Sequence, residues 1–160
     1  MHLWQSISAY DNGYDYESDP MLGNTSTYNR LNRLISRLLL NPERLAANGS
    51  ATNQRLDDKI NLRTELETVR ADIEKQESDS VWTAADLALL DVILGHKDAA
   101  SAYAGFERKN PPDFACQSAL DVVAPLATLE LPTATELKSA ERRLTALRER
   151  AFLKTDRYPN

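Results

Sequence analysis

The spacing of apolar residues along the chain predicts helices and no strands. Apolar side chains recur at intervals of three and four residues, as on one face of a helix, and they show no strand-like alternation. About seven helices are expected, most of them joined by short connections. Their predicted ranges are 3–10, 27–40, 54–76, 81–94, 98–109, 113–130 and 133–151.

The second and third of these helices are predicted to be amphipathic. Each places its apolar residues on one stripe and its charged residues elsewhere, and the third is the longest helix predicted. An Asn-Pro pair at 41–42 ends the second helix or bends it into a short extra turn. The two stripes comprise Tyr28, Leu31, Leu34, Ile35 and Leu38, with Arg30, Arg33 and Arg37 on the other face, and then Leu62, Leu66, Val69 and Ile73.

The fourth helix is apolar almost all round and is expected to lie in the middle of the core. Ser80 is positioned to cap its start, and Gly95 is positioned as the left-handed residue that ends it. Pro125 is expected to kink or end the sixth helix. The sequence Thr-Ala-Thr-Glu at 133–136 has capping-box spacing and opens the last helix.

The fourth and fifth helices carry the spacing of a tetratricopeptide repeat. Small side chains in such a repeat allow close helix approach, an aromatic fills the groove to the next pair, and a proline stops the second helix. Phe106 departs from the pattern, because the repeat has a small residue there. An ordinary antiparallel helix pair in a bundle is the alternative. The residues that fit the repeat-packing pattern are Leu87, Ala88, Gly95, Ala99, Tyr103, Phe106 and Pro111.

A further pattern occupies residues 7–35. An aromatic-x-x-Gly-aromatic sequence is followed by an acidic loop with Asp-Pro and by a Gly-Asn start to the next helix, and a helix pair that begins with Trp82-Thr83 lies downstream. Met21-Leu22 replace the usual aromatic-Pro. The residues of this pattern are Tyr10, Gly13, Tyr14, Asp19, Pro20, Gly23 and Asn24.

With these features, most of residues 7–129 resembles the tetratricopeptide-like region related to the TRAF-binding regulatory domain of apoptosis-signal-regulating MAP kinase kinase kinases. That region also occurs in bacterial multidomain signalling and defence proteins. The resemblance implies an all-α right-handed stack of antiparallel helix pairs. It also implies a non-catalytic scaffold that binds protein or regulates an attached effector domain.

The expected domain organisation is a single helical domain over residues 1–160. The helix at 3–10 resembles the second helix of a repeat without its first helix, which would leave an apolar face uncovered. This indicates either a fragment of a longer protein or a face that docks on a partner. A solitary helix packed on the bundle is the third possibility.

Charge and composition narrow the classes of partner. The net charge of −5 is uneven, since residues 133–160 carry +3 and the remainder −8. The acidic bulk argues against nucleic-acid binding. The basic end is able to contact either an acidic partner or an acidic face of the same protein. Neither a membrane span nor a secretory signal is expected, and a single cysteine, Cys116, fits a reducing, cytoplasmic location.

No catalytic motif stands out in the sequence. There is no glycine-rich phosphate loop, and the two histidines and one cysteine lack zinc-ligand spacing. A Cys116–His96 nucleophilic pair is one alternative, although Cys116 lies beside apolar residues on a predicted helix, where a buried structural cysteine is commoner. A calcium site in the acidic loop at 11–19 is another, although the loop departs from EF-hand spacing. The expectation is therefore a protein that is not an enzyme and needs no cofactor or metal.

Two groups of residues are predicted to bind a partner. Tyr10, Tyr14 and Tyr16 form an aromatic, acidic loop with the composition of an interface hot spot, or they pack back on the helices. Trp82 and Asp86 lie on the first helix of the repeat-like pair, whose apolar and acidic face favours an apolar or basic segment over a carboxylate. The expected function is protein–protein interaction; the alternative is a helical domain that senses a small-molecule ligand.

Overall fold

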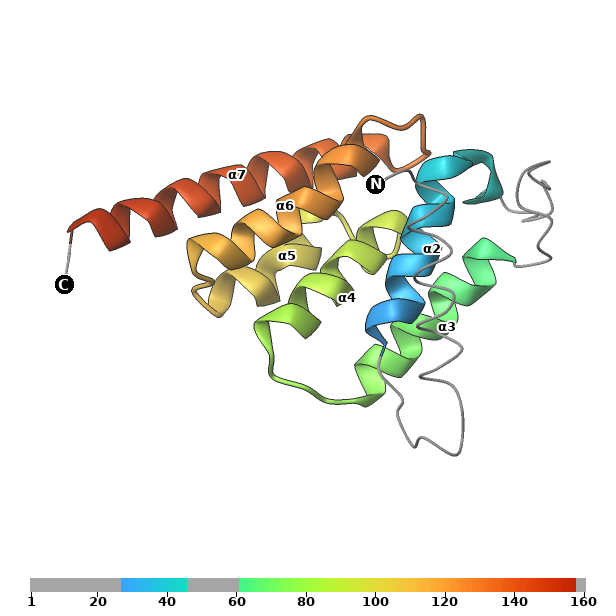
Figure 1. Ribbon diagram of the computed structural model, residues 1–160, viewed down its shortest axis with the longest axis horizontal. Helices are drawn as coiled ribbons and strands as arrows, with labels where there is room; N and C mark the ends of the chain where they lie inside the picture. The colour runs from blue at the N-terminus through green and yellow to red at the C-terminus, as the bar shows by residue number, and fades with distance from the viewer. Residues whose placement is uncertain (1–26, 46–60, 158–160) are drawn as a thin grey trace. The chain divides into compact units, whose positions relative to one another are not determined.

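The computed structural model describes residues 27–45 and 61–157, and this part of the chain consists of helices joined by turns and loops, with no strands (Figure 1). The all-α prediction is confirmed there, with six α-helices in place of about seven; the expected helix at 3–10 lies outside the described residues. The elements are α2 (Tyr28–Leu40), the 3-10 turn η1 (Pro42–Leu45), α3 (Leu62–Lys75), α4 (Val81–Ile93), α5 (Ala99–Arg108), α6 (Asp113–Ala127) and α7 (Ala134–Arg157).

The chain divides into two compact units, residues 1–76 and 77–160. In the first unit, α2 packs on α3 and on η1, the short extra turn predicted at the Asn-Pro pair. Arg30 Nη1 lies 2.7 Å from Asp72 Oδ2, and Arg63 Nε donates to the carbonyl of Leu45 at 3.3 Å. These contacts join the two helices and the turn at the edges of a leucine-rich core.

Two expectations for α2 are wrong. Tyr28 is the first residue of the helix and its side chain is 63% exposed, so the buried stripe begins at Leu31. Arg37 is buried rather than placed on a wet face, and its Nη1 donates to the carbonyl of Arg33 at 3.3 Å. An arginine is able to bury its aliphatic stem when its head group is hydrogen-bonded.

The predicted start of the third helix at residue 54 is also wrong. Asn61 has an extended backbone, and its Oδ1 accepts from the amide of Thr64 at 3.1 Å. Asparagine is a favoured N-cap because its side chain satisfies an amide at the helix start. The helix therefore begins at Leu62, and α7, not α3, is the longest described helix.

The second unit consists of two helical hairpins, α4–α5 and α6–α7. Contacts between the hairpins join α5 to α7 most extensively, and α4 also contacts both α6 and α7. Side chains from all four helices form the core. Its most buried members include Leu90, Ile93, Ala99, Tyr103, Phe106, Cys116, Leu126, Leu137 and Ala140.

The turn between α4 and α5 is built as predicted. Gly95 has a φ of +76°, its amide donates to the carbonyl of Val92 at 3.1 Å, and the amide of His96 donates to the carbonyl of Asp91 at 2.8 Å. This is the Schellman pattern, which satisfies the carbonyls at the end of a helix and requires a left-handed residue. Asp98 then caps α5 by accepting from the amide of Ser101 at 2.7 Å.

The start of α7 fastens it to the other hairpin. Glu136 Oε2 accepts from the amide of Ala99 at 2.7 Å, and Thr133 Oγ1 donates to the carbonyl of Ile93 at 3.4 Å. The two side chains expected to form a local capping box thus reach α5 and α4 instead. Pro125 lies inside α6, which ends two residues later, at Ala127, close to the predicted stop.

Candidate partner-binding site

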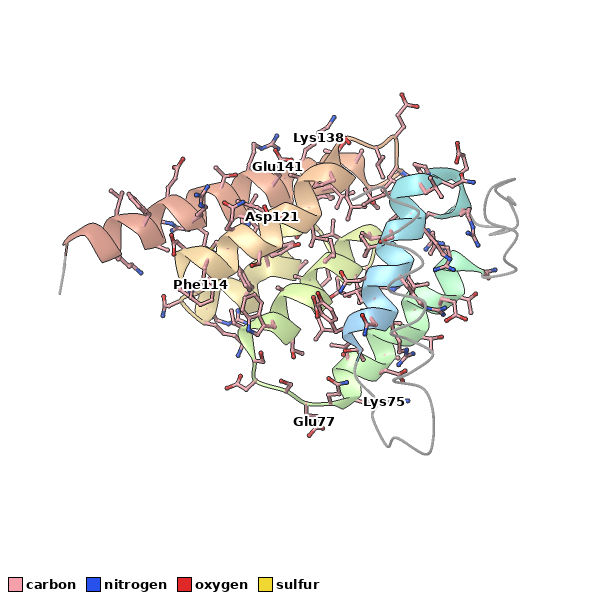
Figure 2. The ribbon with its side chains drawn as sticks, viewed as in Figure 1. Lys75, Glu77, Phe114, Asp121, Lys138 and Glu141 are labelled. Carbon is pink, nitrogen blue, oxygen red and sulfur yellow. The ribbon has the colours of Figure 1, made fainter. Side chains whose placement is uncertain are left out.

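Two exposed aromatic rings meet at the starts of α4 and α6. The ring centroids of Trp82 and Phe114 are 6.2 Å apart and the rings are tilted by 43°. Trp82 is 47% exposed and Phe114 is 62% exposed, and Figure 2 shows Phe114 at the beginning of α6. Paired aromatic rings that remain accessible to water are typical of contact sites on proteins.

The backbone that carries this pair is held in place from several sides. Ser80 Oγ accepts from the amide of Trp82 at 3.2 Å, which caps α4 as predicted. Lys109, at the end of α5, donates from Nζ to the carbonyl of Asp79 at 2.8 Å and to its Oδ1 at 2.5 Å. The residues before α4 are thereby bound to the end of α5, so Trp82 lies on a fixed support.

Asp86 lies one helical turn after Trp82. Burial raises the pKa of its carboxyl group to about 6. Beneath it, burial and the nearby charge of Asp86 raise the pKa of Tyr103. A carboxylate that is largely removed from water is destabilised until a cation approaches it. The charged form of Asp86 is therefore disfavoured by its burial in the folded chain.

Most of the residues predicted to pack the repeat lie in the core of the second unit, whereas Gly95 is exposed in the turn after α4. Ala88, Ala99, Tyr103, Phe106 and Pro111 are buried, and Leu87 is half-buried. The rings of Tyr103 and Phe106 meet edge to face, with centroids 6.3 Å apart. Phe106 departs from the small-residue rule of the repeat, and its ring is fully enclosed in the core.

The other predicted positions do not form a site. Tyr10, Tyr14 and Tyr16, and the acidic loop at 11–19, lie outside the described residues. Cys116 is buried, and burial followed by the charge of Asp113 raises the pKa of its thiol, the opposite of activation. His96 lies in the turn after α4, and the 13 residues of that helix separate it from Trp82 by about 20 Å.

The part of the chain at residues 27–45 and 61–157 holds no cluster of three or more side chains that could ligate a metal ion. It also contains no helix with the length and apolar character needed to cross a bilayer.

Phe114 is the partner-binding candidate that the sequence pattern does not reveal. It falls beside the buried stripe of α6, so a helical-wheel argument would have placed it at the surface. Its meeting with Trp82 depends on how the two hairpins are aligned, which no local pattern encodes. No family model, curated protein or solved structure matches the chain.

Proposed function

We propose that the chain is a protein-interaction module that binds a segment of another protein, or of an attached effector domain, through Trp82, Phe114 and Asp86. The observation that carries this proposal is the exposed Trp82–Phe114 pair on a braced backbone. Aromatic anchors on rigid supports dominate the energetics of most protein interfaces. The raised pKa of Asp86 adds a preference for a basic side chain beside the anchors.

The arrangement of the hairpins supports a tetratricopeptide-like architecture. In a stack of helix pairs, each pair packs on the next, and the α4–α5 hairpin packs on the α6–α7 hairpin through α5–α7, α4–α6 and α4–α7 contacts. Trp82, Asp86 and Phe114 come from the two first helices. A regulatory or scaffolding role in a bacterial signalling or defence protein follows from the resemblance and forms part of the proposal.

The experiment is affinity capture of partners by the tagged chain from lysate of its source cells. Wild type is compared with the W82A/F114A variant, which removes both rings. The matched control is F152A/L153A, since Phe152 and Leu153 are comparably exposed, at 59% and 53%, on α7. All three chains are first checked for equal helicity by circular dichroism.

We expect W82A/F114A to lose a partner that wild type and F152A/L153A both retain. Removal of a central aromatic anchor typically costs about 2 kcal/mol or more, a loss of binding of roughly thirtyfold. The proposal fails if the folded W82A/F114A chain captures the same proteins in the same amounts as wild type.

A further inference from the structure

A groove of about 550 Å³ lies between the end of α5 and the second half of α7, within the unit of residues 77–160. Its apolar floor includes Leu147 and Ala151, and three of its lining residues are the cations Arg108, Arg150 and Lys154. This groove is separate from the Trp82–Phe114 pair, although the connection between α5 and α6 borders both.

The groove is open because α7 is longer than α6, the helix that packs along α7. With 24 residues against 15, α7 is about 13 Å longer than α6 and projects beyond it (Figure 1). Its apolar stripe is fully buried at Leu137, Ala140 and Leu144 but only half-buried at Leu147 and Ala151. The stripe thus continues past its partner helices and leaves an apolar strip at the groove.

The groove has an unbalanced positive charge. Its one carboxylate, Glu107, is engaged by Arg143, whose Nη2 and Nε lie 3.0 and 3.1 Å from Glu107 Oε1. No ion pair joins Arg108, Arg150 or Lys154 to another residue in the described part of the chain. The cations are therefore available to carboxylates from outside.

The form of the groove favours a peptide over a small anion. Arg108, Arg150 and Lys154 are all exposed and stand on the rim, whereas sites for small ligands fix their orientation with a few enclosed polar groups. An apolar strip bordered by cations complements a segment that carries apolar residues on one face and carboxylates beside them.

We propose that this groove binds an acidic amphipathic segment of a partner protein. Apolar side chains of the segment lie against Leu147 and Ala151, and its carboxylates pair with Arg108, Arg150 and Lys154. This inference goes beyond the proposed function, because it assigns a second surface with the opposite charge preference to that of Asp86. It stands or falls separately from the aromatic pair.

The test is fluorescence anisotropy with a fluorescein-labelled 16-residue peptide built from Leu, Ala and Glu, with Leu at helical spacing. A peptide with Gln in place of Glu is the probe control. The full chain is compared with R150Q/K154Q, which removes two rim cations. The matched protein control is K138Q/R142Q, an exposed Lys and Arg with the same i, i+4 spacing on the same helix.

We expect saturable binding of the Glu peptide, at least tenfold weaker binding to R150Q/K154Q, and less than a twofold change for K138Q/R142Q. Binding of the Gln peptide should also be at least tenfold weaker. Equal losses of affinity for the Glu peptide in the two variants would show that the peptide is attracted by the overall positive charge of α7, and would overturn the proposal. So would equal binding of both peptides, or no saturable binding up to about 1 mM peptide.

Sedimentation velocity of the chain alone tests whether a second copy of the chain occupies the groove. Self-association that R150Q/K154Q abolishes and K138Q/R142Q retains would show that a second copy fills the groove, and it would overturn the assignment to a partner. A monomeric wild-type chain agrees with the proposal. The W82A/F114A variant should bind the Glu peptide as wild type does, which separates failure here from failure of the proposed function.

Discussion

At the scale of single residues, we expect the charged carboxyl group of Asp86 to lower the free energy of unfolding near neutral pH. This carboxyl group lies on a largely apolar helix near the fully buried Tyr103, and its pKa is raised by burial. An amide or apolar side chain would avoid the desolvation of a charge there. A group that weakens the folded state is a candidate for a binding role, because a cationic partner would remove the penalty.

The Asp86→Asn variant tests this reading through the pH dependence of stability. The folded-state pKa of about 6 is above the value of 3.8 for the unfolded chain, so the folded state holds the proton more tightly. The wild-type free energy of unfolding should therefore fall as pH rises from about 4 to about 6. Asn removes this fall and should raise stability near pH 7 by about 2 kcal/mol.

Urea unfolding of both chains near pH 4 and near pH 7 provides the measurement. Near pH 4 the two chains should differ little, since the carboxyl group is mostly protonated in the folded state. An Asp86→Asn chain that is equally or less stable than wild type near pH 7 would show that the carboxylate is not strained.

At the scale of elements, two glycines have opposite roles in neighbouring segments. Gly95 ends α4 with a φ of +76°, whereas Gly105 lies within α5. A Cβ atom at either position would meet its nearest neighbour at 3.8 Å, which is ordinary contact. Any effect of alanine at these positions therefore comes from the backbone and not from crowding.

Gly95→Ala should destabilise the chain by about 1–2 kcal/mol, because an L side chain disfavours the left-handed backbone. Gly105→Ala should stabilise it by about 0.5–1 kcal/mol, because alanine has less backbone freedom to lose in a helix. Thermal unfolding of the two variants beside wild type measures both changes. Shifts of the same sign would contradict the assigned helix boundaries.

Helical spacing and capping residues predicted much of the element structure. Ser80 and Gly95 mark the ends of α4 as expected, because each satisfies backbone groups within its own segment. Thr133 and Glu136 have an equally good local signal but bond to the other hairpin. Local patterns fail there because a nearby helix end offers the same side chains a competing partner.

The candidate site shows the same division. The sequence indicates Trp82 as a partner-binding residue by its place on an apolar helix, and Asp86 by its charge on the same helix. Phe114 and the groove cations come together through the alignment of helices that are distant in sequence. In the sequence, Arg108 and Arg150 look like ordinary charged residues on solvent-exposed helix faces. Periodicity does not indicate which helices lie beside one another, so it does not show that the two residues share a groove.

At the scale of the whole molecule, charge and exposed apolar groups are distributed unevenly. The chain carries −5 overall, but residues 133–160 carry +3. Within the unit of residues 77–160, the Trp82–Phe114 pair has an acidic neighbour and the α5–α7 groove has basic ones. Two surfaces of unlike chemistry on one unit are what a scaffold needs to hold two different segments.

The most direct test is the accessibility of Trp82 in the complex with the captured partner. Trp4 is first replaced by Phe, so that Trp82 is the only tryptophan in the chain. Acrylamide quenching of its fluorescence is then measured with and without a partner segment that lacks tryptophan. We expect strong quenching for the free chain and at least a twofold lower quenching constant in the complex. Unchanged quenching with the partner fully bound would show that Trp82 is not part of the interface.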